Sequence, residues 1–155
     1  MSNNLSRDLS LGQNGEDIVL EFLREKYPDA KRIFGNHKEY DILIPSQDLR
    51  IEVKTDLLSQ DTGNLAIEYE SYGKPSGINV TTAEFWAFIY FYKDTWYGGL
   101  WPIKSLKEVC KKAWSVSGGD DMASKIYLFP VSKAHKLMDT WKIPEKMLET
   151  LARTR

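Results

Sequence analysis

The chain has one cysteine, no long apolar run and no excess of basic charge, and each scarcity excludes a class of protein. Cys110 alone cannot form an internal disulfide or a cysteine-rich zinc site, which indicates a reducing compartment. No stretch of roughly 18 apolar residues exists, and the N-terminus MSNNLSRDLS lacks an apolar signal region. We therefore expect a cytoplasmic protein, in the host cytoplasm if the chain is viral, with no membrane partner.

The net charge of −1 argues against a protein that coats DNA, because such proteins are normally basic. It does not exclude a nuclease, whose site concentrates acidic residues while basic groups elsewhere follow the phosphates. Apolar residues make up 42% and charged residues 28% of the chain, as in ordinary globular proteins. At 155 residues we expect one domain over 1–155, with residues 1–9 as a loose N-terminal arm.

The order of the predicted elements indicates an α/β fold. Apolar periodicity predicts a helix from about Ser10 to Tyr27, closed by Pro28. We expect strands at about 32–34, 40–45, 49–56, 64–71, 85–92, 96–103 and 126–131, and further helices over 105–114, 133–140 and 144–153. We also expect a helical turn at 81–84, a bulge at Gly98-Gly99 and a loop over 115–124. These elements predict a mixed β-sheet flanked by helices.

Two neighbouring strands carry acidic residues on otherwise apolar segments. Side chains two residues apart on a strand share a face about 7 Å apart, so Glu52 and Lys54 point one way while Ile51 and Val53 point into a core. If the two strands form a hairpin, Asp41 comes near Glu52. Two carboxylates beside an ammonium can hold a divalent metal and a water against a phosphodiester. The simpler alternative is a solvated face of an edge hairpin, although Asp41 interrupts an apolar strand.

Glu16 is a second acidic residue in an apolar setting. On the predicted helix it falls inside the apolar arc, between Leu23 and Tyr27, whereas Asp17 lies on the opposite side. A carboxylate on a core-facing arc is costly unless it has a partner. Glu16 is therefore either part of the site or a residue near the helix start that interacts with the helix dipole.

The segments GEDIVLEFL, YDILI and IEVKTD resemble the motifs of the PD-(D/E)XK nuclease superfamily, which includes restriction enzymes and Holliday junction resolvases. The segment TGNLAIEYESYGKPSGINVTTAEFWAFIY is similar to small phage-type members, and the resemblance covers roughly residues 10–92. Tyr40 stands where the motif name would put proline. The resemblance implies a restriction-endonuclease-like fold.

The resemblance also implies roles for individual residues. Asp41 and Glu52 would bind Mg²⁺, with Mn²⁺ as a substitute, together with the carbonyl oxygen of Val53. Lys54 would orient or help deprotonate the attacking water, and Glu16 could hold a second metal or a metal-bound water. Three weaker candidates are Glu68 near the site, and Lys74 and Ser76 in a loop whose backbone N–H groups could hold a phosphate.

The function implied is that of a Mg²⁺-dependent DNA endonuclease that hydrolyses phosphodiester bonds, in recombination or repair. Branched or junction DNA is favoured as substrate because the chain is small and has no evident sequence-reading module, and a homodimer would supply the two cuts that a junction requires. Restriction-like cleavage of duplex DNA is the alternative within this class. The rival is a non-catalytic domain that binds nucleic acid or protein and keeps the nuclease fold.

Overall fold

A computed structural model describes residues 2–35 and 39–152, with the side chains of 2–13, 120, 150 and 152 left undescribed. The strands form two sheets. A six-stranded sheet has the order β1-β2-β3-β6-β7-β10, and a four-stranded sheet has the order β5-β4-β9-β8. Strand β3 pairs with β6 in parallel and every other pairing within these sheets is antiparallel. The prediction of a mixed sheet flanked by helices is confirmed.

The strands of the larger sheet are β1 (Lys31–Arg32), β2 (Ile42–Ile44), β3 (Leu49–Thr55), β6 (Phe85–Tyr92), β7 (Thr95–Pro102) and β10 (Asp139–Lys142). The strands of the smaller sheet are β4 (Asn64–Ser71), β5 (Lys74–Pro75), β8 (Trp114–Gly118) and β9 (Ser124–Pro130). The helices are α1 (Ser2–Lys26), α2 (Ser59–Thr62), α3 (Ile103–Cys110), α4 (Val131–Leu137) and α5 (Glu145–Ala152), with short 3-10 turns η1 (Pro45–Gln47), η2 (Gly77–Asn79) and η3 (Asp120–Met122).

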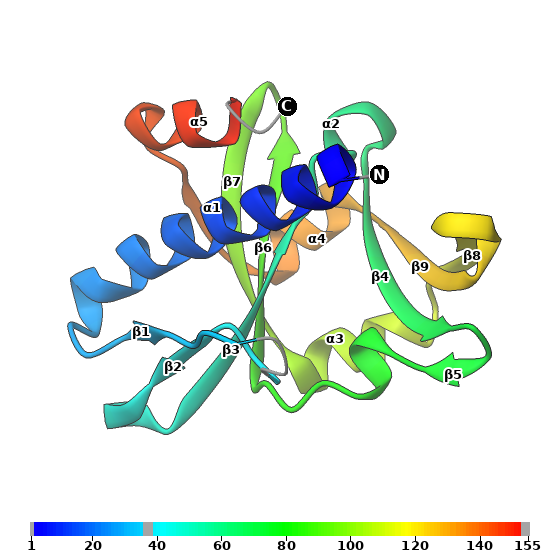
Figure 1. Cartoon of the computed structure of the whole chain (residues 1–155), viewed down its shortest axis with the longest axis horizontal. Coiled ribbons are helices and arrows are strands. Elements are labelled where there is room, and N and C mark those ends of the chain that lie inside the picture. Colours follow the sequence, from blue (N-terminus) through cyan, green and yellow to red (C-terminus); the bar gives the residue numbers. More distant parts are fainter. Residues whose placement is uncertain (1, 36–38, 153–155) are drawn as a thin grey trace.

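The larger sheet separates two apolar cores. On one face, α1 and α5 pack over residues such as Ile51 of β3 and Ile89 of β6. On the other face, Trp86 and Phe88 of β6 share a core with β4, β9, α3 and α4. Figure 1 shows α1 crossing the larger sheet, with β4, β9 and β8 standing to its right. None of the helices in the described part of the chain is long and apolar enough to span a membrane.

The first helix begins earlier than the sequence suggests. It runs from Ser2 to Lys26, so residues 2–9 are helical and the expected loose arm is wrong for them, while Met1 lies outside the described residues. The physical reason is that no proline and no glycine stands between Ser2 and Leu11. An established helix then extends at little cost per residue.

Four further expectations differ from the structure, and pairing between distant segments decides most of them. Residues 114–118, expected largely as loop, form β8 against β9, and 139–142 form β10 against β7. No bulge occurs at Gly98-Gly99, where the β6–β7 register is continuous. A Cβ at Gly98 would collide with the ring of Trp141, so the glycine makes room for that ring. In place of a turn at 81–84, the chain makes η2 just before it.

An arginine and a glutamate join β3 and β6 where their parallel pairing begins. The Arg50 guanidinium donates to both carboxylate oxygens of Glu84, at 2.8–3.1 Å. The backbone N–H of each residue also bonds to the other, Arg50 N to Glu84 Oε1 at 2.7 Å and Glu84 N to Arg50 O at 2.9 Å. Burial raises the pKa of the Glu84 carboxyl, but the hydrogen bonds from Arg50 outweigh it and hold this pKa below its ordinary value of 4.5.

The stability that Glu84 supplies should therefore depend on pH. A carboxyl whose pKa is lower in the folded state stabilises the fold above its unfolded-state pKa and loses that effect as pH falls through the folded value. We expect Glu84→Gln to lower the free energy of unfolding at pH about 6, with the difference from wild type shrinking towards pH about 3. Urea unfolding at each pH measures this. The control is Glu108→Gln on the exposed face of α3, which should change little at any pH. A wild-type to Glu84→Gln difference that stays constant with pH would contradict the assignment.

Candidate active site

Asp41 lies at the point where the β2–β3 ladder ends. The last regular pair is Ile42 with Ile51, and the next pair in that register is Asp41 with Glu52. The Asp41 N–H donates to the carbonyl oxygen of Ile51 at 3.0 Å. Its carboxylate Oδ2 accepts a hydrogen bond from the Val53 N–H at 2.8 Å. Asp41 is only 7% exposed. Its carboxylate lies against the middle of β3, where a neighbouring strand would otherwise supply the hydrogen-bond acceptor.

The predicted alternation along β3 is confirmed. Ile51 and Val53 pack in the α1-side core, so Glu52 and Lys54 point to the opposite face, and both are half-buried. Glu52 pairs with Trp86 across the parallel ladder, and the Lys54 Nζ lies 4.9 Å from the centre of the Trp86 ring. Glu52 and Lys54 thus share one face of β3, and the Asp41 carboxylate lies at the edge of that strand.

Val53 contributes its backbone to the same place. In a strand the N–H and C=O of one residue point to the same edge. Because the Val53 N–H points to Asp41, the Val53 carbonyl oxygen also points to that edge of β3, beyond the end of the β2–β3 ladder. The carboxylates of Asp41 and Glu52 and this carbonyl are hard oxygen donors, the type that Mg²⁺ and Mn²⁺ prefer. Within the described residues, no group of three His, Cys, Asp or Glu side chains is placed to hold a metal ion.

Glu16 is buried, at 5% exposure, as its place on the apolar arc predicts. It lies far along α1 from Ser2, so the alternative that it interacts with the N-terminal helix dipole is wrong. Its Oε2 is 3.8 Å from Nη2 of Arg32 on β1, whose Nη1 makes a 2.7 Å ion pair with Asp17. Since α1 covers the face opposite Glu52 and Lys54, the strand geometry does not by itself bring Glu16 to those two side chains.

The weaker candidates form a separate group on β4 and the loop after it. Glu68 accepts hydrogen bonds from the Ser76 hydroxyl at 3.0 Å and from the Ser124 hydroxyl at 2.8 Å. Leu65 and Ile67 point into the core shared by the sheets, so Glu68 points away from it. Lys74 is exposed in β5. Glu68 and Ser76 therefore lie together, but not around the strand that carries Glu52.

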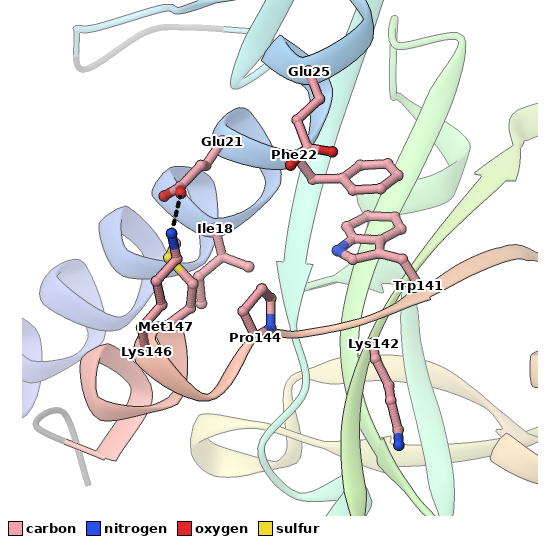
Figure 2. Close-up of a pocket in the computed structure, with 9 residues that line it drawn as sticks. All are labelled: Ile18, Glu21, Phe22, Glu25, Trp141, Lys142, Pro144, Lys146 and Met147. Carbon is pink, nitrogen blue, oxygen red and sulfur yellow. Dashed lines mark ion pairs between the residues drawn. The ribbon is translucent and has the colours of Figure 1, made fainter.

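Three surface pockets of the described residues are lined by α1. A pocket of about 240 Å³ opens between α1 and the β10–α5 connection, and Figure 2 shows its residues. Phe22 and Trp141 stack in it with ring centres 3.8 Å apart, and Glu21 and Lys146 form an ion pair of 3.4 Å at its rim. Two further hollows of about 320 and 350 Å³ are also lined by α1. These pockets open on the α1 side of the sheet, whereas Glu52 and Lys54 face the other side.

Sequence reasoning missed the residues that surround the acidic ones. Arg32 gave no signal because β1 is only two residues long and its ion pair joins distant segments. Trp86 stood out only as one aromatic residue in an apolar strand. The register of the parallel β3–β6 ladder puts it beside Glu52, and a parallel register follows from the whole fold rather than from a local pattern.

Comparisons with known proteins give little further guidance. No protein-family model matches the sequence. No curated protein matches it either. Among solved structures, the chain is similar to the bacterial homing endonuclease I-Ssp6803I, with a TM-score of 0.48 and 15% sequence identity over 92% of this chain and 91% of that chain. At that identity and TM-score, the candidate site depends on the contacts described above and not on the likeness.

The Asp41–Val53 hydrogen bond can be tested without any activity. Asp41→Ala leaves the Val53 N–H without its acceptor, which should lower the free energy of unfolding by about 1–3 kcal/mol. Asp41→Asn keeps an acceptor oxygen and removes a charge next to Glu52, so it should be at least as stable as wild type in EDTA. Urea unfolding and hydrogen exchange at the Val53 amide measure the two effects.

Asp29→Ala is the matched control, because the Asp29 carboxylate accepts the Ser46 N–H at 2.7 Å in an exposed position. Its loss of stability should be smaller than that of Asp41→Ala, because water can replace an exposed acceptor. If Asp41→Ala is as stable as wild type and its Val53 amide exchanges no faster, the described geometry is wrong.

Proposed function

We propose that this chain is a metal-dependent endonuclease that hydrolyses phosphodiester bonds in DNA. The observation that supports the proposal most is the 2.8 Å bond from Val53 N–H to Asp41 Oδ2, which keeps an acidic side chain beside the strand that carries Glu52 and Lys54. Burial makes such a carboxylate costly, and a role in holding a metal would account for its buried position. The fold is compatible with this reading, and the superfamily assignment to the PD-(D/E)XK nucleases is part of the proposal.

Each residue has a defined task in this proposal. Asp41, Glu52 and the Val53 carbonyl would hold Mg²⁺ or Mn²⁺, which when bound offsets phosphate charge and makes a water more acidic. Lys54 donates hydrogen bonds from its ammonium to the scissile phosphate or to the attacking water, and so orients the water in line with the leaving oxygen. Glu16 lies near Arg32. It belongs to the proposed site only if the site can be reached from the α1 side of the sheet.

The net charge of −1 leaves little general attraction for DNA, so local positive groups such as Lys54 must engage the backbone. Branched or junction DNA is the preferred substrate and duplex DNA the alternative, with a homodimer as the form that supplies paired cuts.

A non-catalytic binding domain is the second candidate function. The observation in its favour is that the Lys54 ammonium contacts the Trp86 ring, so this lysine already has a partner within the protein. Such a domain would bind nucleic acid without cutting it, and a cleavage assay separates the two functions.

The purified protein should cleave branched or duplex DNA in Mg²⁺ or Mn²⁺ and not in EDTA. Asp41→Asn, Glu52→Gln and Lys54→Ala should each lower the rate by about 10²-fold or more without unfolding the protein. The matched control is the pair Glu70→Gln and Lys125→Ala, because these residues form a 3.2 Å ion pair on β4 and β9, away from Asp41. Cleavage by Lys54→Ala at the wild-type rate would contradict the mechanism, and binding without cleavage by wild type would favour the binding domain.

Glu16 has its own test. If it belongs to the site, Glu16→Gln should lower the cleavage rate at least tenfold more than Glu21→Gln, which removes an exposed partner of Lys146 on the same helix. Asp17 is not a suitable control, because its ion pair with Arg32 lies next to Glu16. Equal rates for the two variants would give Glu16 a purely structural role with Arg32.

A further inference from the structure

The Lys54 side chain rests on a buried indole. Its Nζ lies 4.9 Å from the centre of the Trp86 ring, within the distance at which an ammonium is attracted to the face of an aromatic ring. Trp86 is 1% exposed, so the ring cannot move aside without disturbing the core. Tryptophan gives the strongest attraction of this kind among the aromatic side chains.

The strand register shows that this contact redirects the lysine. Across the parallel ladder Lys54 pairs with Phe88, whereas Trp86 pairs with Glu52. The Lys54 side chain therefore leans along the strand to the diagonal neighbour, a contact that long side chains can reach. The lean brings the ammonium towards the row of Glu52 and Asp41 and away from its own row.

The orientation of the indole is itself fixed. Its Nε1–H donates to the Thr81 hydroxyl at 3.1 Å, and the Ala83 N–H donates to the same oxygen at 3.3 Å. Thr81 follows η2, whose loop is docked on β4. A Cβ at Gly77 would collide with the carbonyl oxygen of Glu68, and the Asn79 side chain donates to the Tyr69 carbonyl at 3.0 Å.

A second tryptophan provides an internal comparison. Trp101 on β7 pairs directly with Trp86, is fully buried in the same core, and donates from its Nε1 to the Ser105 hydroxyl at 3.2 Å. Among the described residues only Trp86 of these two has an ammonium over its ring. The two residues therefore share burial and hydrogen bonding and differ in their contact with Lys54.

We propose that Trp86 is a positioning residue that holds the Lys54 ammonium beside Glu52 and Asp41, and that Thr81 fixes the ring in the required orientation. The catalytic meaning of this placement rests on the proposed nuclease function, in which Lys54 serves the scissile phosphate. The placement itself is a property of the protein without metal or DNA. The β4–β6 loop then acts on the site through Thr81 and the ring.

The test is an NMR measurement on the protein free of metal and DNA. The Lys54 Hε and Cε signals, assigned by their loss in Lys54→Arg, should show an upfield ring-current shift in wild type. Trp86→Phe should lose about half of that shift or more, because the smaller ring presents less aromatic face. Thr81→Val should also change it, while Trp101→Phe and Ser105→Ala should leave it unaltered. The cleavage rate should fall about tenfold in Trp86→Phe and in Thr81→Val relative to the Trp101→Phe and Ser105→Ala controls.

The outcomes separate the placement from the function. Lys54 signals that are unshifted in wild type, or that respond equally to Trp86→Phe and Trp101→Phe, would overturn the proposal whatever the DNA assay shows. If the signals behave as expected but wild type cleaves no DNA, the placement stands and the nuclease function fails. If wild type cleaves DNA and all four variants cleave at equal rates, the positioning role is overturned and the nuclease stands. Thr81→Val lies at the edge of the core and tests the same claim if Trp86→Phe fails to fold.

Discussion

The parallel pairing of β3 with β6 is the constraint on which the site depends. It places Glu52 beside Trp86 and Lys54 beside Phe88, and it turns Ile51 and Val53 towards α1. A shift of one residue would exchange the faces of every side chain on β3, moving the charged pair into the α1-side core. Hydrogen bonds between Arg50 and Glu84, at the start of both strands, oppose that shift because they join the strands through backbone and side chain.

The β2–β3 ladder stops at the pair Ile42–Ile51, and this determines which group bonds to Val53. If the β2–β3 ladder continued, Val53 would be hydrogen-bonded to backbone and Asp41 would be one more strand residue. Asp41 precedes β2, which begins at Ile42, and its carboxylate takes the position of a backbone acceptor. The proposed metal site, with Asp41, Glu52 and the Val53 carbonyl as donors, depends on this arrangement.

The sequence was informative where chemistry follows from local pattern. Alternation predicted the faces of β3, and the apolar arc predicted that Glu16 is buried, as the structure confirms. Contacts between segments far apart in the sequence could not be predicted from local pattern. Trp114–Gly118 becomes a strand only because β9 lies beside it, Gly98 is small because Trp141 lies over it, and Arg32 finds Asp17 across the fold. The helix start at Ser2 was missed because Ser, Asn and Asp recur through residues 2–10, so no single N-cap marks where the helix begins.

The most direct measurement is a Mn²⁺ titration of the protein followed by paramagnetic broadening of assigned backbone amide signals. The account predicts that broadening is strongest at Asp41 and at Glu52–Lys54, and that Asp41→Asn weakens it there. Broadening centred on the Glu21–Glu25 rim of the α1 pocket, or no broadening at β3 at millimolar Mn²⁺, would contradict the claim that these residues form a metal site.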